Sequence, residues 1–241
     1  MANLVEDFFI NKLSKNIDSL TEELNSVSSE FDYYITQIGG AKKFTNAGTY
    51  SFKIPKGIST IKVSGIGGGG GGGGGGTHSN AAGGGGGGGR AYYTLDFVIN
   101  VTEGEILTVI IGAGGAGGQR QTVTGNGYDG KTGEKTQLLR GETVLFTVNA
   151  GTYGSGGLGS NGGGGAGGSV GGVTGTARSS GGAGGAGGST TLFAGFGNGG
   201  AGGAGSSTSG INDPGKAGSA GKNGALVICF GANVSFQDVG W

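Results

Sequence analysis

The chain has 241 residues, of which 67 are glycine, about four times the usual share. Only 12% of the residues are charged, and 15 basic and 15 acidic side chains give a formal net charge of zero. This balance argues against nucleic-acid binding, which needs a basic excess. No apolar run is long enough for insertion into a membrane.

A single cysteine and a single histidine limit the chemistry that the chain can support. Cys229 lies in the apolar run Ala225–Phe230, which predicts a buried thiol that packs as a small hydrophobe. With one cysteine and one histidine, His78, the chain cannot build a common zinc site. We therefore expect no metal, no cofactor and no enzymatic activity.

Residues 1–40 predict an N-terminal helix. Its apolar residues recur at alternating steps of three and four, a heptad pattern that predicts an α-helical coiled coil serving as stalk and attachment segment. A single amphipathic helix packed on its own domain is the alternative. Isoleucine and leucine at the seam favour two strands, but the bulky Phe31 and Tyr34 leave three open. The expected oligomerisation residues are Ile10, Leu13, Ile17, Leu20, Leu24, Val27, Phe31, Tyr34 and Ile38.

Residues 41–241 predict a glycine-rich β-sandwich domain. The turn at Thr102–Glu105 carries Glu103 and Glu105, but two carboxylates in a short turn are typical of a solvated loop rather than of a catalytic pair. Alternating or continuous apolar residues bounded by turn residues predict strands at 49–54, 58–65, 90–100, 106–111, 136–139, 143–148 and 225–230. The expected core is Tyr50, Phe52, Ile54, Ile61, Val63, Tyr93, Leu95, Phe97, Ile99, Leu107, Val109, Ile111, Leu145, Val148, Leu226 and Ile228.

Long glycine runs separate these strands. Gly67–Gly76 and Gly83–Gly89 are unbroken, and the later runs repeat Gly-Gly-X with alanine or asparagine at X. Flexible linkers are one interpretation. Runs of nearly pure glycine and alanine, pinned between strands, favour instead polyproline-II-type (polyglycine II) helices that bond to one another. The expected fold class is therefore mainly β with glycine-rich polyglycine II helices, preceded by an N-terminal α-helical coiled coil.

Contacts to a partner should lie where the glycine pattern is interrupted, because loops on a rigid scaffold carry binding residues. Tyrosine, asparagine and arginine side chains suit sugar recognition, although each could equally be an ordinary loop residue. The candidate receptor-binding residues are His78, Asn80, Arg120, Asn126, Tyr128, Tyr153 and Arg178.

Three segments stand out together: Phe44–Val63 with the glycine run after it, Ile106–Gly118 after the Thr-Glu-Gly-Glu turn, and Gly221–Phe230. They resemble the glycine-rich domain of phage tail-fibre and other bacterial-virus surface proteins. A looser likeness, in composition alone, is to tip adhesins of T-even-like phages, which hold variable loops on a polyglycine II layer.

The resemblance implies a virion fibre or fibre tip, assembled in the host cytoplasm as a homotrimer and joined to other virion proteins through its N-terminus. It would bind a bacterial surface glycan or protein. A capsid or collar fibre without receptor binding, an ice-binding protein and a depolymerase stay as alternatives. The depolymerase would need paired acids in a groove, which the sequence does not indicate.

Overall fold

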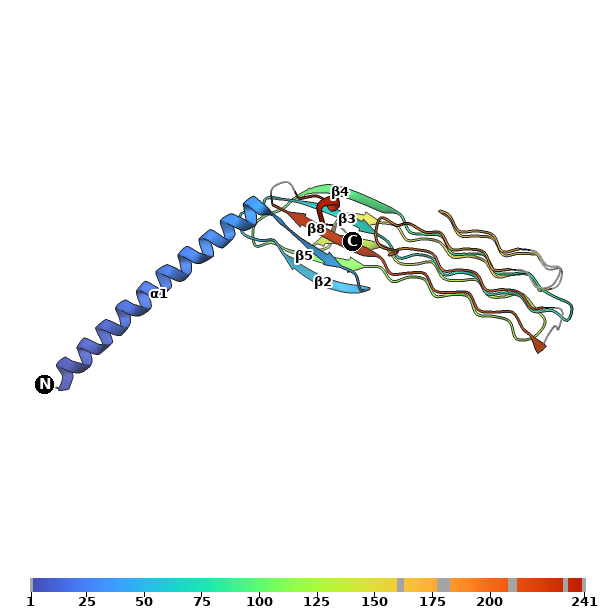
Figure 1. Cartoon of the computed structure of the whole chain (residues 1–241), viewed down its shortest axis with the longest axis horizontal. Helices are drawn as coiled ribbons and strands as arrows, with labels where there is room; N and C mark the ends of the chain where they lie inside the picture. Colours follow the sequence, from blue (N-terminus) through green and yellow to red (C-terminus); the bar gives the residue numbers. More distant parts are fainter. Residues whose placement is uncertain (1, 160–162, 177–182, 208–211, 232–233, 240–241) are drawn as a thin grey trace.

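The computed structural model describes residues 2–159, 163–176, 183–207, 212–231 and 234–239, with α1 side chains described from Ile10 to Phe31. The molecule is elongated and has three parts in a row (Figure 1): a long N-terminal helix, a β-sandwich, and a bundle of extended glycine-rich segments. The chain leaves the sandwich and returns to it repeatedly, so the bundle grows out of one end of the sandwich, on the side away from the helix.

Two four-stranded antiparallel sheets form the sandwich. One has the strand order β1-β8-β3-β4 and the other the order β2-β5-β6-β7. The strands are β1 (Gly40–Phe44), β2 (Gly48–Lys53), β3 (Thr60–Ile66), β4 (Tyr93–Asn100), β5 (Ile106–Ile111), β6 (Thr136–Arg140), β7 (Thr143–Val148) and β8 (Ala225–Phe230).

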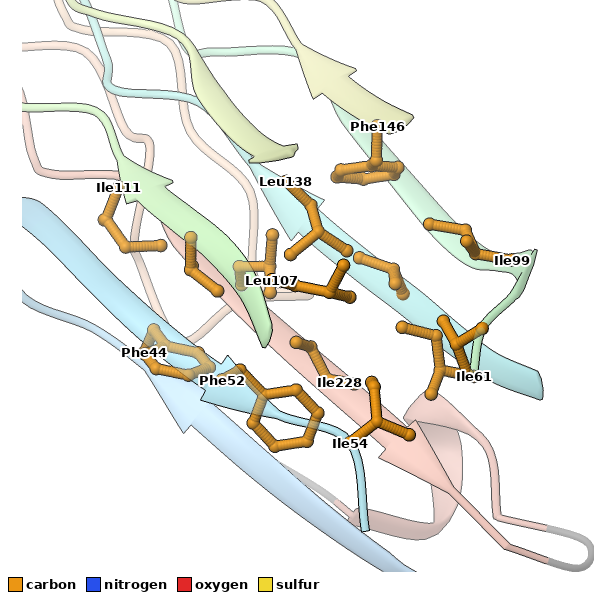
Figure 2. Close-up of a cluster of buried hydrophobic side chains, with 14 of the residues drawn as sticks. Phe44, Phe52, Ile54, Ile61, Ile99, Leu107, Ile111, Leu138, Phe146 and Ile228 are labelled. Atoms are coloured by element: carbon orange, nitrogen blue, oxygen red, sulfur yellow. The ribbon is translucent and has the colours of Figure 1, made fainter. Parts of the chain in front are cut away.

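The main hydrophobic core fills the space between the two sheets (Figure 2). It takes alternate side chains of each strand, such as Leu107, Val109 and Ile111 of β5, which are buried because successive residues of a strand point to opposite faces. A second cluster covers the outer face of the first sheet, where Phe193 and Phe236 stack with their ring centroids 4.8 Å apart. Phe236 opens the short helix α2 (Phe236–Val239).

Cys229 packs in this second cluster and is buried, as predicted. Burial raises the pKa of its thiol to about 11, with a smaller contribution from the carboxylate of Asp96. The thiol therefore stays protonated near neutral pH and behaves as a small apolar group.

The prediction for β4 is wrong at three of its four core positions. Ile99 is buried, but Tyr93, Leu95 and Phe97 are 36–46% exposed. The register of β3 against β4 shifts between Val63 and Gly65. At the same place Asp96 adopts a positive φ of 49°, and the resulting bulge re-aims the side chains of this edge strand.

The predicted N-terminal coiled coil, and with it the expected fold class, is wrong. Residues Ala2–Ile38 form one helix, α1, and no second long helix packs against it among the described residues. The structure is mainly β, with two antiparallel sheets. A heptad spacing places apolar residues on one helix face, but it does not by itself supply a partner helix. The seam side chains are 54–69% exposed at Ile10, Leu13, Ile17, Leu20, Leu24, Val27 and Phe31, and those of Tyr34 and Ile38 lie outside the described side chains.

Residues 67–77 run along the centre of the glycine bundle. Their amides donate to different neighbours in turn with a repeat of three residues, so Gly68, Gly71 and Gly74 all donate to the segment 125–135. Hydrogen bonds join residues 67–77 to six described segments: 83–91, 112–119, 125–135, 149–159, 197–206 and 215–224.

Residues 83–91 form a second centre beside the first. Hydrogen bonds join them to 67–77, 149–159, 163–169, 172–176, 183–188 and 197–206. A segment surrounded on all sides has no room for a Cβ atom: one built on Gly71 would overlap the carbonyl oxygen of Ala116, and one on Gly87 that of Ala186. The two unbroken glycine runs in the sequence are therefore the two central segments of the bundle.

The remaining segments bond to one another in a closed ring around the two centres. Each has an open side, and the third residue of the Gly-Gly-X repeat lies there, as the exposed Ala116 and Ala186 do. Buried backbone groups must be paired. In this bundle the buried amides and carbonyls are paired by hydrogen bonds between neighbouring extended segments, and not by those of a β-sheet or an α-helix.

Candidate functional site

The glycine bundle ends in a group of loops at the pole of the molecule farthest from α1 (Figure 1). We call this group the distal end and define it by the described residues 77–82, 119–127, 158–159, 206–207 and 212–215. The loops connect segments that are held in register by backbone hydrogen bonds, so the bundle fixes where each loop begins and ends.

Thr77 joins three of these loops. Its backbone exchanges hydrogen bonds with Gly125, at N···O distances of 2.9 and 2.8 Å. Its hydroxyl donates to the carbonyl oxygen of Gln121 and accepts from the amide of Gly215, 2.9 Å away. Because Thr77 is fully buried, this network is shielded from water and holds the loops together.

Two of the candidate receptor-binding residues, His78 and Asn80, lie at the distal end. The amide of His78 donates to Oγ of the buried Ser206 at 3.0 Å, and that hydroxyl donates back to the carbonyl of His78 at 3.2 Å. Nδ1 of His78 accepts from the amide of Asn80 at 3.3 Å, so one ring nitrogen of the imidazole stabilises its own loop. The Asn80 side chain is exposed.

Arg120 and Asn126 lie on the neighbouring loop. Arg120 is exposed. Oδ1 of Asn126 accepts from the amide of Gly159, and Oδ1 of Asp129 accepts from that of Gly156, both at 2.8 Å. The two side chains are three residues apart, which matches the glycine repeat. Each therefore accepts a hydrogen bond from an outward-pointing amide of the adjacent segment 149–159. Asn126 therefore has a structural role that its position in a loop did not indicate.

The two tyrosines lie on the sides of the bundle. Tyr128 is 56% exposed and close to the distal end, level with Gly74. Tyr153 is 42% exposed and lies about midway, beside the hydrogen bond from Gly154 to Gly71. The structure thus brings His78, Asn80, Arg120 and Asn126 together at one end, with Tyr128 near them and Tyr153 apart. Arg178 lies outside the described residues.

A hollow of about 500 Å³ opens between the segments 112–119 and 125–135. Sequence reasoning found Tyr128 in this region but missed Gln119 and Lys131 as members of a shared site. The signal was the three-residue repeat, which places residues 128 and 131 on one side of their segment. The lining residues are Ala116, Gly117, Gln119, Tyr128, Asp129 and Lys131.

A family model described as a glycine-rich domain matches residues 45–237. The match covers most of the chain, including the strands β2 to β8 of the sandwich and the bundle. The chain belongs to the glycine-rich domain family. No curated protein matches it.

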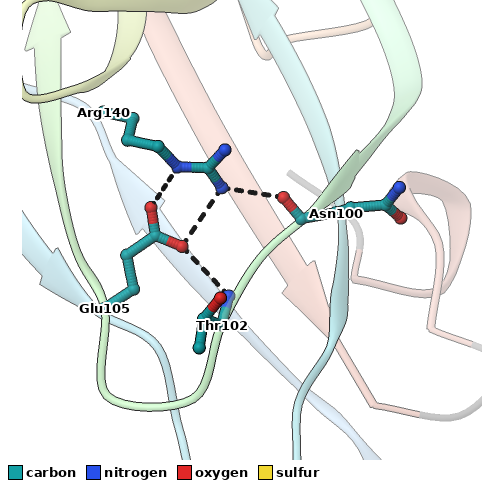
Figure 3. Close-up of polar contacts among 4 residues, drawn as sticks. All are labelled: Asn100, Thr102, Glu105 and Arg140. Atoms are coloured by element: carbon teal, nitrogen blue, oxygen red, sulfur yellow. Dashed lines mark hydrogen bonds and ion pairs between the residues drawn. The ribbon is translucent and has the colours of Figure 1, made fainter.

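The acidic turn of this glycine-rich domain is a structural clamp between its sheets (Figure 3). Glu105, at the end of the β4–β5 turn, forms an ion pair with Arg140 of β6 and accepts from the amide of Thr102 at 3.0 Å. The same guanidinium donates to the carbonyl of Asn100 at 2.8 Å. The hydrogen bond from Arg140 lowers the pKa of Glu105, outweighing the effect of burial.

Glu103 has a comparable local role, because its carboxylate accepts from the amide of Gly57 at 3.0 Å. Both acidic residues of the turn are thus engaged by backbone or guanidinium donors. Among the described residues of the glycine-rich domain, no three His, Cys, Asp or Glu side chains gather where they could hold a metal ion. Within the same residues, no helix has the length and hydrophobicity needed to cross a bilayer.

Proposed function

We propose that this glycine-rich domain protein is a structural fibre or fibre-tip protein of a bacteriophage virion, and that its distal end attaches to the host surface. The observation that carries the proposal is the convergence of loops at one pole, with α1 leading away from the other. Four of the residues predicted to bind a receptor lie at that pole, and three of them, Asn80, Arg120 and Asn126, are exposed.

The bundle suits such a role because its stiffness comes from backbone hydrogen bonds rather than from a large apolar core. Loops fixed at both ends lose less conformational freedom when they bind, so side chains can vary there without loss of the scaffold. The assignment to a bacterial virus rests on the resemblance of Phe44–Val63, Ile106–Gly118 and Gly221–Phe230 to fibre proteins.

The proposal includes self-assembly, as a homotrimer, through α1. Seven large apolar side chains on one face of this helix are more than half exposed. A contiguous apolar face of this kind on a protein surface marks an interaction site. Assembly through α1 would keep each distal end free.

Attachment is tested with the fluorescently labelled full chain and a panel of intact bacteria, scored by flow cytometry. We expect binding to at least one strain, and weaker binding by Asn80→Ala and Arg120→Ala. Lys53→Ala is the matched control, because Lys53 is exposed on the sandwich, far from the distal end. Equal binding by all variants would locate attachment away from Asn80 and Arg120, and no binding to any strain would favour a fibre without a receptor.

A further inference from the structure

The hollow beside Tyr128 is a second feature of the bundle, separate from the loops of the distal end. We propose that it binds one residue of a neutral saccharide on the bacterial surface, an inference that rests on the proposed attachment function. Its volume of about 500 Å³ is in the range of small-molecule sites, roughly 300 to 1,000 Å³.

Tyr128 supplies the apolar surface of the site. More than half of this side chain is exposed although it lines the hollow. An aromatic ring offers a large contact area at a low cost in conformational entropy, and the tyrosine hydroxyl adds a polar end. The C–H face of a sugar ring has a matching shape and polarity.

Three polar side chains around Tyr128 match the hydroxyl groups of a sugar, which both donate and accept hydrogen bonds. The Gln119 amide can do both, the Lys131 ammonium donates, and the Asp129 carboxylate accepts. Lys131 and Asp129 have opposite charges, so the hollow carries no net charge that would select a phosphate or a cation. A neutral polyhydroxylated ligand fits this set best.

The site is preorganised by hydrogen bonds to its own backbone. The amide of Tyr128 donates to the carbonyl of Gln119 at 3.1 Å, and that of Lys131 donates to the carbonyl of Ala116 at 2.8 Å. Oδ1 of Asp129 accepts from the amide of Gly156 at 2.8 Å, which restrains this side chain. Binding therefore does not have to order the walls of the hollow.

The test uses saturation-transfer difference NMR on the full chain, with the methyl glycosides of glucose, galactose and N-acetylglucosamine as probes. We expect transfer to at least one probe, and a loss of affinity of about tenfold or more in Tyr128→Ala, as for aromatic binding hot spots. Asp129→Asn, which retains the Oδ1 acceptor for Gly156, should also weaken binding. Tyr92→Ala removes an exposed tyrosine beside the start of β4, away from the hollow, and should bind as the native chain does.

Two results would overturn the inference: no transfer to any probe, or equal transfer in Tyr128→Ala and the native chain. Thermal melting of each variant checks that it folds; exposed Tyr128 should tolerate the change. The whole-cell assay separates the two proposals. Either of these two results, together with cell binding that survives Tyr128→Ala, would refute the hollow and leave attachment standing. Saccharide binding without cell binding would support the hollow and count against attachment.

Discussion

Single glycines are essential for the packing of the bundle, because its centre has no space for an added methyl group. A Cβ on Gly71 would overlap the carbonyl oxygen of Ala116, a backbone atom that cannot move without breaking its hydrogen bond from Lys131. At Gly163, on the outer ring, the nearest atom is Cδ1 at the end of the flexible Leu158 side chain. The same change of residue should therefore have very different effects at the two positions.

We expect Gly71→Ala to lower the thermal unfolding midpoint strongly, since overpacking costs about 1–3 kcal/mol or more. Gly163→Ala should melt within a few degrees of the native chain. Circular dichroism melts of the three proteins make the comparison. Equal midpoints for the two variants would show that the central segment is not closely packed.

The ion pair of Glu105 should make the stability of the sandwich depend on pH, and the direction of its pKa shift gives the sign. Its pKa is lowered in the folded chain from an ordinary value of 4.5, so its contribution to stability is present above that value and is lost as the pH falls through the folded pKa. The native chain should thus lose stability as the pH falls below about 4.5. Denaturant melts on both sides of this pH measure the loss, and Glu105→Gln should show a smaller one. If the stability of Glu105→Gln depends on pH as that of the native chain does, the ion pair of Glu105 with Arg140 is not the cause of the loss.

At the scale of the helix, the exposed face of α1 makes a prediction about assembly. Leu20 is 64% exposed on that face, and a carboxylate there would be buried unpaired in any interface, at a cost of roughly several kcal/mol. We expect Leu20→Glu to sediment as a smaller species than the native chain. Ser19→Glu places the same charge on the neighbouring polar position and should leave the sedimentation coefficient unchanged. A native chain that sediments as a monomer would contradict assembly through α1.

The strands show how far the sequence specifies the elements. Expected strands at 106–111, 143–148 and 225–230 match β5, β7 and β8, because each carries several β-branched or large apolar residues between turn residues. β1 was missed. Its only buried side chain is Phe44, and its lysines are exposed, as is typical of an edge strand. The segment therefore lacks the alternation of apolar and polar residues from which a strand is predicted.

The candidate site was predictable in outline and not in detail. Some interruptions of the glycine repeat lie in loops that meet at the distal end, and others, such as those at Tyr128 and Tyr153, lie in segments of the bundle. The sequence could not reveal that Asn126 pairs an amide of a segment 33 residues away, or that Gln119 and Lys131 flank one hollow. These relations depend on which segments become neighbours in the bundle, and every glycine segment has nearly the same local sequence. Only the lengths of the pure glycine runs distinguish the central segments from the outer ones.

For the whole molecule, function depends on how firmly the distal end is joined to the bundle, and Thr77 provides the junction. Its hydroxyl pairs the buried amide of Gly215 and the carbonyl of Gln121, which belong to two other loops. Thr77→Val keeps the shape of the side chain but leaves the Gly215 amide without its acceptor, at a cost of about 1–3 kcal/mol. The loss is local, since the hydrogen bonds along the rest of the bundle are untouched.

We therefore expect Thr77→Val to accelerate amide hydrogen exchange around Gly215 and Gln121, with little change in exchange across the strands of the sandwich. The same variant should bind bacteria more weakly than the native chain, because loosened loops must be ordered again on binding. Ser219→Ala, on the exposed side of the segment 215–224, is the control. Faster exchange with unchanged cell binding would locate attachment away from these loops, and unchanged exchange would show that Thr77 does not hold them together.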